Sequence, residues 1–476
     1  MEKARLIFFR FLGLYLIYVL VFAVIIFAIY NPKEKESIEI FANKDGRMEP
    51  SIGDRATLVG LPEEAIRVRL DLIETAQESI DISYYALLGG ESVQVFLSSI
   101  LEAADRGVEV RILLDGIFNN LNGSLRGSVN AFTAHPNIDL KLYEPLNILL
   151  PMSWNNRLHD KFIIVDGKLA LIGGRNIGDK YFFPDEFKDK YVKDRDALIY
   201  NERLTDGSAS VIDDMQEYYN YVWNHKYSKT PKKSLTSREE RRAKEVKDGL
   251  RNNHAELIKP YATSNGKVDW HKMTIPVDNI KFVCNPIGRS NQDPWCLKEL
   301  YNLASQAEET VFAQSPYIIP SRTMKNNLKN YDIDFNKVSV LTNSLASSPN
   351  PFAVAGYSNN RKKIVNNNIE VFEYQGPDSI HAKTYIFDDY TSVIGSFNLD
   401  ARSSHLSTES MVIIESEEFA KELKESIDID LNKSLKIDKD YSYVANKDIK
   451  EGKASSLKKI FIGALSKITL FIDYLL

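Results

Sequence analysis

One polar pattern occurs twice in the sequence, in distant parts of the chain. The first copy is His159-x-Lys161-x4-Asp166, and after six further residues comes Gly173-Gly-Arg-Asn176. The second copy is His381-x-Lys383-x4-Asp388, and after the same six residues comes Gly395-Ser-Phe-Asn398. A single H-x-K-x4-D match arises by composition in on the order of a few chains per hundred. Two matches with the same downstream G-x-x-N offset indicate a duplicated domain.

The predicted helices and strands around the two copies follow the same order. The first half predicts helices at 67–78 and 92–106, with strands at 80–85, 108–114 and 138–143. The second half predicts helices at 297–309 and 351–366, with strands at 310–319, 337–342 and 369–374. A repeat of this size predicts an α/β protein with two similar domains in a pseudo-twofold arrangement.

The chain divides into five predicted parts. Residues 1–47 form an N-terminal tail and anchor, 48–225 the first half, 226–274 a charged linker, 275–435 the second half and 436–476 a C-terminal tail. The total of 476 residues suits two or three domains of about 150 residues each. The linker holds the run Arg238-Glu-Glu-Arg-Arg-Ala-Lys-Glu, which is typical of an exposed helix.

Residues 11–30 carry no charge and predict a transmembrane helix. At 1.5 Å per residue the run spans ~30 Å, the thickness of a bilayer core. A cleaved signal peptide is the alternative, but the apolar run is too long and no small-x-small site follows it. Basic residues lie on both sides of the span and do not decide its orientation: Lys3, Arg5 and Arg10 before it, Lys33, Lys35, Lys44 and Arg47 after it. The short basic N-terminus favours an extracytoplasmic catalytic region.

Two further segments combine apolar and polar residues. Residues 457–476 have charges at near-helical spacing, which predicts a helix on the membrane surface or one docked on the body. The insertion 145–157, just before the first motif, contains Leu146, Ile148, Leu149 and Trp154. It is interpreted either as a loop that dips into the membrane interface or as packing between the halves.

Alternation along a strand places the histidine and the lysine of each motif on one face. Asp166-Gly167 predicts a turn that returns the chain to Asn176, and Asn398 follows the second motif in the same way. If the halves pack face to face, two histidines, two lysines and two asparagines meet in one volume. Asp166 and Asp388 belong to the motifs, and we expect them to close turns or brace lysines.

This set of side chains suits a phosphodiester. A neutral imidazole can attack phosphorus and a charged one can protonate the leaving oxygen. Ammonium and amide groups can stabilise the oxygens as charge develops, so neither a metal nor another cofactor is expected. Asp196 and Glu409 are the predicted carboxylates that orient the imidazoles, because each opens an apolar, strand-like run. Asp194 is considered only as a metal ligand with Asp196, and no further ligand lies nearby.

These residues resemble the phospholipase D superfamily, and more narrowly the C-type bacterial cardiolipin synthases. The resemblance covers most of residues 60–435. It includes Asn156-Arg-Leu-His-Asp-Lys161, Ile172-Gly-Gly-Arg-Asn-Ile-Gly-Asp179 and Gly395-Ser-Phe-Asn-Leu-Asp-Ala-Arg-Ser403. Such enzymes form a phosphatidyl-histidine and pass the phosphatidyl group to an alcohol on a second lipid.

The resemblance implies a role for each matching residue. His159 and His381 would be the nucleophile and the acid/base pair, with His159 favoured as nucleophile. Lys161, Lys383, Asn176 and Asn398 would bind phosphate. The implied substrates are phospholipids: phosphatidylglycerol, with phosphatidylethanolamine as a second candidate.

Several alternatives remain open. A phospholipase D would use the same intermediate but deliver water to it. A nuclease is disfavoured by the net charge of -5 and by the anchor, so no nucleic-acid partner is expected. A non-catalytic membrane scaffold would tolerate loss of motif residues, and none is lost. Cys284 and Cys296 are expected to be free, with a disulfide as the alternative outside the cytoplasm. The sequence does not predict the oligomeric state.

Overall fold

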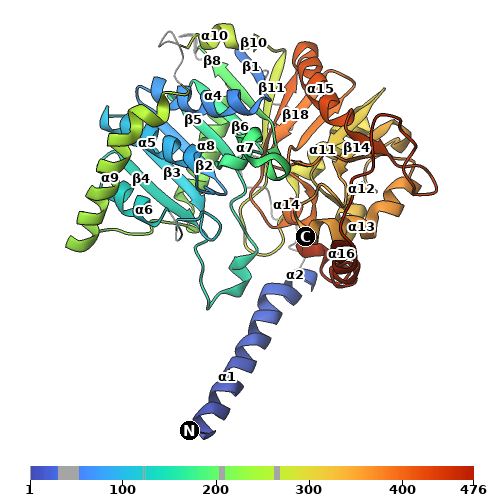
Figure 1. The fold of residues 1–476 in the computed structure, drawn as a ribbon, viewed down its shortest axis with the longest axis horizontal. Coiled ribbons are helices and arrows are strands. Elements are labelled where there is room, and N and C mark those ends of the chain that lie inside the picture. Colours follow the sequence, from blue (N-terminus) through green and yellow to red (C-terminus); the bar gives the residue numbers. More distant parts are fainter. Residues whose placement is uncertain (1, 30–52, 122, 124, 203–209, 262–267) are drawn as a thin grey trace.

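The computed structural model describes residues 2–29, 53–121, 123, 125–202, 210–261 and 268–476. Within these residues the chain forms two α/β halves side by side and a long helix that projects from them (Figure 1). The predicted boundary between residues 47 and 48 lies outside the described residues, as do Lys33, Lys35, Lys44 and Arg47.

A nine-stranded sheet forms the first half, in the order β10-β1-β8-β6-β5-β2-β3-β4-β9. Its strands are β1 (Asp54–Val59), β2 (Ser79–Tyr84), β3 (Glu109–Asp115), β4 (Ile138–Tyr143), β5 (Lys161–Val165), β6 (Leu169–Gly173), β8 (Asp196–Asn201), β9 (Ser228–Lys229) and β10 (Ile275–Pro276). The parallel strands β2, β3 and β4 are joined by helical crossovers, of which the sequence predicted the one between β2 and β3, whereas β5 and β6 form the hairpin of the first motif.

The second half contains an eight-stranded sheet in the order β11-β20-β18-β17-β12-β14-β15-β21. Its strands are β11 (Asn279–Cys284), β12 (Val311–Gln314), β14 (Val338–Asn343), β15 (Glu370–Tyr374), β17 (Thr384–Phe387), β18 (Thr391–Gly395), β20 (Ser410–Glu415) and β21 (Ser434–Lys436). This order matches the order from β1 to β9 strand for strand, so the predicted duplication of an α/β unit is confirmed. The strand predicted at 310–319 is broken at Pro316, and β13 (Ile318–Ile319) leaves the main sheet to pair with β19 (Leu399–Asp400).

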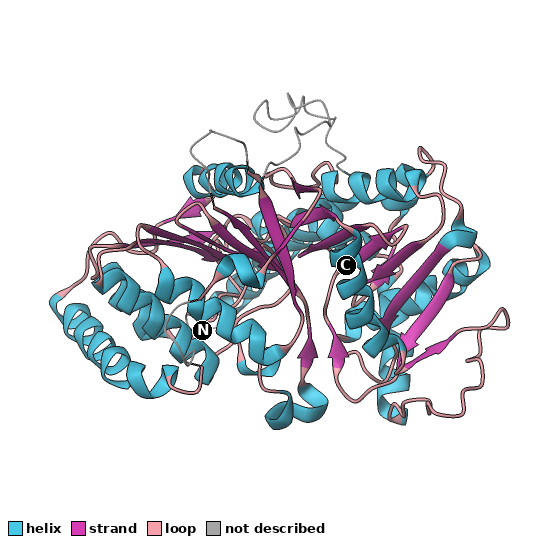
Figure 2. Ribbon diagram, turned by 90° about the horizontal axis from the view of Figure 1, so that it is seen from above, coloured by secondary structure: helices cyan, strands magenta, loops and turns pink. Residues whose placement is uncertain are grey.

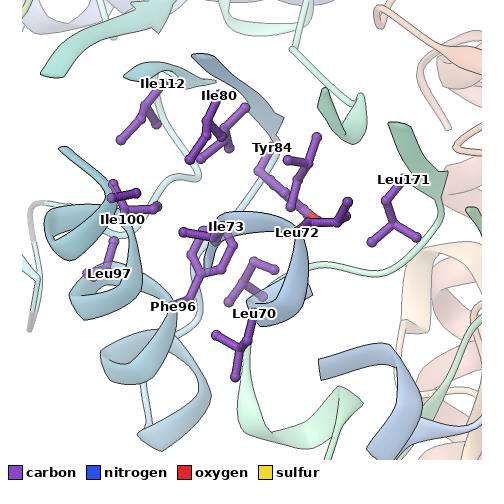
Figure 3. Close-up of a cluster of buried hydrophobic side chains, with 14 of the residues drawn as sticks. Leu70, Leu72, Ile73, Ile80, Tyr84, Phe96, Leu97, Ile100, Ile112 and Leu171 are labelled. Atoms are coloured by element: carbon purple, nitrogen blue, oxygen red, sulfur yellow. The ribbon is translucent and has the colours of Figure 1, made fainter. Parts of the chain in front are cut away.

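Helices cover the outer faces of both sheets (Figure 2). In the first half these are α4 (Pro62–Thr75), α5 (Glu91–Asp105), α6 (Arg126–Thr133) and α9 (Ser237–Ile258), and in the second half α11 (Trp295–Gln306), α12 (Arg322–Leu328), α13 (Pro351–Asn366) and α14 (Ala401–His405). The helices α8 (Val211–Asn224) and α15 (Glu417–Leu431) pack on the inner faces, in the apolar cluster that the halves share. The apolar faces of α4 and α5 meet β2 and β3 in a dry core, where Ile73, Tyr84 and Phe96 interlock (Figure 3).

A continuous apolar cluster joins the two halves. It contains Phe162 and Tyr218 from the first half and Phe282 and Val412 from the second, all buried. Each half also sends a helix to a strand of the other, since α8 contacts β11 and α15 contacts β1. The two sheets therefore share a core, which fixes the motif of one half relative to the motif of the other.

The described part of the charged segment, residues 226–261 and 268–274, packs on the first half. Its helix α9 lies along α5 and α6, and Arg251 forms an ion pair of 2.6 Å with Asp105. His254 Nδ1 lies 3.0 Å from Ser98 Oγ, and Leu250 and Leu257 contact the core. A helix was predicted correctly here, but its inner face is docked on the body and only its outer face is exposed.

The N-terminal helix is longer than the uncharged run that predicts it. It runs through α1 (Glu2–Leu20), the π-helical turn η1 (Val21–Ile25) and α2 (Ile26–Ile29). The helix formed by residues 3–29 is long and apolar enough to cross a membrane, and most of its side chains are exposed. The end of the helix is packed on the body, where Phe27 contacts Leu406 and Leu475.

The C-terminal helix α16 (Ser456–Thr469) is docked on the body, one of its two predicted arrangements. Ile462 and Leu465 pack against Val354 and Ala355 at α13. The opposite side exposes apolar side chains, among them Leu457, Ile460, Phe461 and, after the helix, Phe471. The helix is docked on the body and also presents an apolar surface on the side of the molecule from which α1 projects (Figure 1).

Asp166 and Asp388 close equivalent turns at the far ends of the motif strands. Asp166 accepts hydrogen bonds of 2.8–2.9 Å from the backbone N–H groups of residues 77–79, and Asp388 accepts three of 2.7–2.9 Å from residues 308–310. Both residues have φ of +52°, a conformation that aspartate tolerates better than most residues. These contacts give both aspartates a structural role, at the opposite end of the strand from the histidine.

We expect Asp166→Ala and Asp388→Ala each to lower the free energy of unfolding by about 1–3 kcal/mol, because three N–H groups lose their acceptor and alanine is strained at positive φ. Urea unfolding of the detergent-solubilised chain measures this change. Asp166→Asn and Asp388→Asn are the matched controls, because they keep an acceptor oxygen and tolerate the turn. Unchanged stability in the alanine variants would contradict the structural role.

Candidate active site

The imidazole of His159 is held by a carboxylate from the other half. His159 precedes β5, and its Nδ1 lies 2.9 and 3.0 Å from the two carboxylate oxygens of Glu409, which precedes β20. The backbone N–H of His159 donates to Thr408 Oγ1 at 3.0 Å, so the two segments run side by side. Glu409 was predicted as an orienting carboxylate, and the structure places it in contact with His159.

The second histidine has the reverse arrangement. His381 Nδ1 lies 2.5 Å from Asp194 Oδ2, and Asp194 belongs to the first half, between β7 (Val192–Lys193) and β8. The short strand β16 (Ser379–Ile380) pairs with β7 and brings His381 to that carboxylate. Each half therefore orients the imidazole of the other.

Asp196 does not orient a histidine, which corrects the sequence prediction. Its carboxylate lies 3.0 Å from Arg69 Nη2 and 3.1 Å from Arg175 Nε, and all three side chains are buried. The two arginines bind Asp196 inside the first half, leaving Asp194 to reach His381. The register shows the equivalence: Gly173 pairs with Asp196 and Gly395 with Met411, so Asp194 corresponds to Glu409. Asp194 lies two residues before Asp196, as Glu409 lies two residues before Met411, so the strand register identifies Asp194 as the carboxylate equivalent to Glu409.

The two motif lysines are buried beside the histidines. Lys161 Nζ donates to the carbonyl oxygen of His159, and Lys383 Nζ donates to that of His381 and lies 2.8 Å from its Nδ1. Burial lowers the pKa of Lys161 to about 7 and that of Lys383 to about 8. The charge of each lysine lowers the pKa of the other half's histidine, so both motifs act on one volume.

Both imidazoles favour the neutral form. Burial, followed by the charges of Lys161 and Lys383, holds the pKa of His159 well below 6.5. Burial and Lys383 lower the pKa of His381 to about 3, against the opposing effect of Asp194. The side chains are still 15% and 18% exposed. With each Nδ1 facing a carboxylate, Nε2 is the nitrogen left for chemistry.

Asn176 and Asn398 take equivalent positions after β6 and β18. Asn176 Nδ2 donates to the Tyr181 hydroxyl at 3.1 Å, and Asn398 Nδ2 donates to Ser403 Oγ at 3.2 Å. The amide oxygen Oδ1 of each asparagine is buried and has no hydrogen-bond partner among the described residues. Unsatisfied buried amides at the same place in both halves are typical of groups that bind a ligand, since either end of an amide can face it.

Two tyrosines that sequence reasoning missed contact the imidazoles. Tyr85 packs edge-on against His159 with ring centroids 5.2 Å apart, and Tyr181 packs against His381 at 5.7 Å. Both come from the first half. Tyr85 directly follows β2, a position that could have suggested a place at the rim, whereas Tyr181 reaches the second motif only through the packing of the halves.

Glycine in the G-x-x-N runs makes room for the neighbouring strand. A Cβ on Gly174 would lie 2.4 Å from Asp194 Oδ1, and one on Gly395 would lie 2.3 Å from the carbonyl oxygen of Ser410. Any larger residue at 174 would displace the carboxylate that holds His381. The absence of a side chain at Gly174 and Gly395 thus lets the neighbouring strand and its carboxylate approach closely. Cys284 and Cys296 are free and buried in the structure.

Comparisons with known proteins agree with this geometry. The family model described as "Cardiolipin synthase, PLD-like domain" matches residues 70–223 and 300–431. Cardiolipin synthase C of Escherichia coli K12 is 29% identical over 393 residues, covering 75% of this chain and 80% of the relative. A cardiolipin synthase of Staphylococcus aureus Mu50 is 23% identical over 368 residues, covering 77% and 65%. The crystal structure of a phosphatidylserine synthase from Haemophilus influenzae Rd KW20 superposes with a TM-score of 0.60 at 16% identity, covering 88% and 95%, and shares the fold.

The two neighbouring aspartates are expected to respond differently to the same substitution. Asp196→Asn leaves two buried guanidinium groups without their counter-charge, so we expect the free energy of unfolding to fall by about 3–5 kcal/mol. Asp194→Asn is expected to cost less stability but to change the tautomer of His381, because the amide can donate to Nδ1. Urea unfolding and the ring ¹⁵N shifts of labelled histidine measure the two effects. Equal destabilisation with an unchanged His381 signal would contradict the assignment.

Proposed function

The chain belongs to the family of cardiolipin synthases with a phospholipase D-like domain, and on this premise we propose that it forms cardiolipin from phosphatidylglycerol and a second phospholipid. The family makes it an enzyme of the phosphatidyltransferase kind. The observation that carries the specific proposal is the reciprocal pairing of His159 with Glu409 and of His381 with Asp194. This pairing orients two imidazoles, one from each copy of the motif, so that both could act on one phosphodiester.

In the first proposed step, His159 Nε2 attacks the phosphorus of phosphatidylglycerol. An N–P bond forms while the bond between phosphorus and the headgroup oxygen breaks. The leaving glycerol oxygen takes a proton from His381. This imidazole is neutral in the free site, and the negative charge of the bound phosphate raises its pKa so that it can carry that proton. Free glycerol departs and a phosphatidyl-histidine remains. The low pKa of His159 supports this role, because the attacking nitrogen must carry a lone pair.

In the second step, neutral His381 removes the proton from a headgroup hydroxyl of the second lipid. That oxygen attacks phosphorus and the N–P bond breaks, so His159 is regenerated and cardiolipin is released. Phosphatidylethanolamine is a second candidate donor of the phosphatidyl group, with ethanolamine as its leaving group. Glu409 and Asp194 act as positioning residues throughout, since they fix the ring orientation and stabilise a charged imidazole.

Lys161, Lys383, Asn176 and Asn398 are proposed to bind the equatorial phosphoryl oxygens. The two ammonium groups are buried, where their attraction for developing negative charge is stronger than in water. The anchor would keep the enzyme on the membrane that holds both lipids. We propose an orientation in which the N-terminus lies in the cytoplasm and the catalytic body lies outside it.

Incubation of the detergent-solubilised chain with phosphatidylglycerol is expected to yield cardiolipin and glycerol in equal amounts. His159→Ala and His381→Ala should each lower this rate by at least about 10³-fold, because each removes a group needed in both steps. Lipid chromatography measures the products. Phosphatidic acid as the only product would show a hydrolase, and no lipid product would overturn the proposal.

A substrate with a good leaving group separates the two histidines. Phosphatidyl-p-nitrophenol needs no acid for the first step, so His381→Ala should still release a burst of p-nitrophenolate, whereas His159→Ala should not. The reverse pattern would make His381 the nucleophile. Asp166→Asn serves as a matched control with the motif histidines intact.

The pH dependence of kcat, which reports the enzyme with the phosphodiester bound and the pKa of His381 raised, is expected to be bell-shaped. The nucleophile pKa lies well below 6.5, so the acid limb should fall below that value. Lys161 and Lys383, with pKa values of about 7 and about 8, lose their charge as pH rises, so activity should fall above about pH 8. Lys383→Arg keeps its charge and should move the alkaline limb to higher pH. A limb that stays in place in both Lys161→Arg and Lys383→Arg would contradict this assignment.

A further inference from the structure

The loop before the first motif is attached to the anchor helix. Tyr15 donates its hydroxyl proton to the carbonyl oxygen of Ile148 at 2.9 Å, and Tyr18 donates to that of Leu149 at 2.8 Å. Phe27 marks the docked end of the helix, and Tyr18 and Tyr15 lie about 14 and 18 Å from it along the helix axis. If the anchor crosses a bilayer core of about 30 Å, the loop tip reaches about half of that depth.

The carbonyl groups at the tip of the loop are paired within the protein. The four consecutive carbonyl oxygens of residues 147–150 all accept hydrogen bonds, from Leu150 N and Trp154 Nε1, from the two tyrosines, and from Ser153. This pairing lowers the cost of placing the loop tip in a membrane, where each unsatisfied polar group costs several kcal/mol. The side chains of Leu146, Ile148 and Leu149 are 60–71% exposed, so they are available to contact acyl chains.

A cationic groove lies at the base of the loop. Its volume is about 540 Å³, and it is lined by Glu144, by apolar and polar residues of the loop, and by Lys226, Tyr227, Lys229 and Arg289. Arg289 pairs with Glu144 at 2.7 Å and stacks over the Tyr227 ring at 4.5 Å. The remaining charge of the groove comes from two exposed ammonium groups, those of Lys226 and Lys229. One wall is therefore apolar and the other carries net positive charge.

We propose that this groove and loop form a binding site for an anionic phospholipid, separate from the catalytic centre. The acyl chains would lie along Leu146, Ile148 and Leu149, while the phosphate would contact Lys226 and Lys229. The anchor decides between possible occupants, because the tyrosine contacts place the apolar wall inside the lipid phase. Arg157, two residues before His159, stabilises the base of the loop. Its guanidinium donates to the carbonyl oxygens of Glu144 and Ser153. A bound lipid would thus hold the segment that leads into the first motif.

Fluorescence quenching tests this site without turnover. Leu149→Cys places a thiol at the loop tip for a fluorophore, since both native cysteines are buried. The full chain, also carrying His159→Ala and His381→Ala so that no lipid is consumed, is reconstituted in phosphatidylcholine vesicles. Doxyl-labelled phosphatidic acid or doxyl-labelled phosphatidylcholine is added at the same mole fraction. We expect stronger quenching by the anionic lipid, with on the order of a fivefold local enrichment for each lysine.

Lys226→Gln with Lys229→Gln should make the two doxyl lipids quench equally while leaving the depth signal intact. Lys421→Gln with Lys424→Gln, on the exposed face of α15 away from the anchor, is the matched control and should change nothing. Equal quenching by both lipids before substitution would overturn the lipid site, and no quenching by either would overturn insertion of the loop. The lysine double variant should retain turnover in detergent, so failure of this proposal is distinguishable from failure of the proposed enzyme activity.

Discussion

The exchange of carboxylates between the two halves is the interaction on which the rest of the site depends. Glu409 holds His159 and Asp194 holds His381, and each contact crosses the interface. Neither half alone has an oriented imidazole, so the shared apolar cluster and the crossed helices α8 and α15 are conditions for the chemistry. A rotation of one half would separate both imidazoles from their partners at once.

The charges in the site are arranged for a negative ligand. Two buried ammonium groups face two neutral imidazoles, and burial disfavours each charge enough to bring both lysine pKa values close to neutrality. A phosphodiester would supply the missing counter-charge and raise the affinity of the lysines and of the acid histidine for protons. Asp194 keeps its pKa low despite burial, because Lys383 and His381 surround it, whereas burial raises the pKa of Glu409 to about 8. The symmetric fold therefore contains two electrostatically different imidazole–carboxylate pairs, which gives the two histidines a physical basis for different roles.

Sequence reasoning recovers what is encoded within one half. Strand alternation and duplication place His159, Lys161 and Asn176 on one rim, and the turn signals at Asp166 and Asp388 correspond to hydrogen-bonded turns. The missed features arise from packing between segments. Asp194 could not be separated from Asp196 by alternation, because both face the same side; the buried arginines Arg69 and Arg175 decide between them. The contacts of Tyr181 with His381 and of α9 with α5 likewise join parts of the chain whose spacing carries no signal.

The anchor ends directly behind the catalytic residues, and this position relates the membrane to the chemistry. Asn155, four residues before His159, donates to the carbonyl oxygen of Ala23 at 2.7 Å. Leu406, three residues before Glu409, packs on Phe27, and its carbonyl oxygen accepts from Asn156 at 2.9 Å. The segments that deliver His159 and its carboxylate therefore both rest on the last turns of the anchor. A phospholipid carries its phosphate where the hydrocarbon ends. If the helix crosses the bilayer as proposed, it leaves the hydrocarbon at that same depth. On the proposed function, the phosphorus would then reach the imidazoles with its acyl chains still in the bilayer.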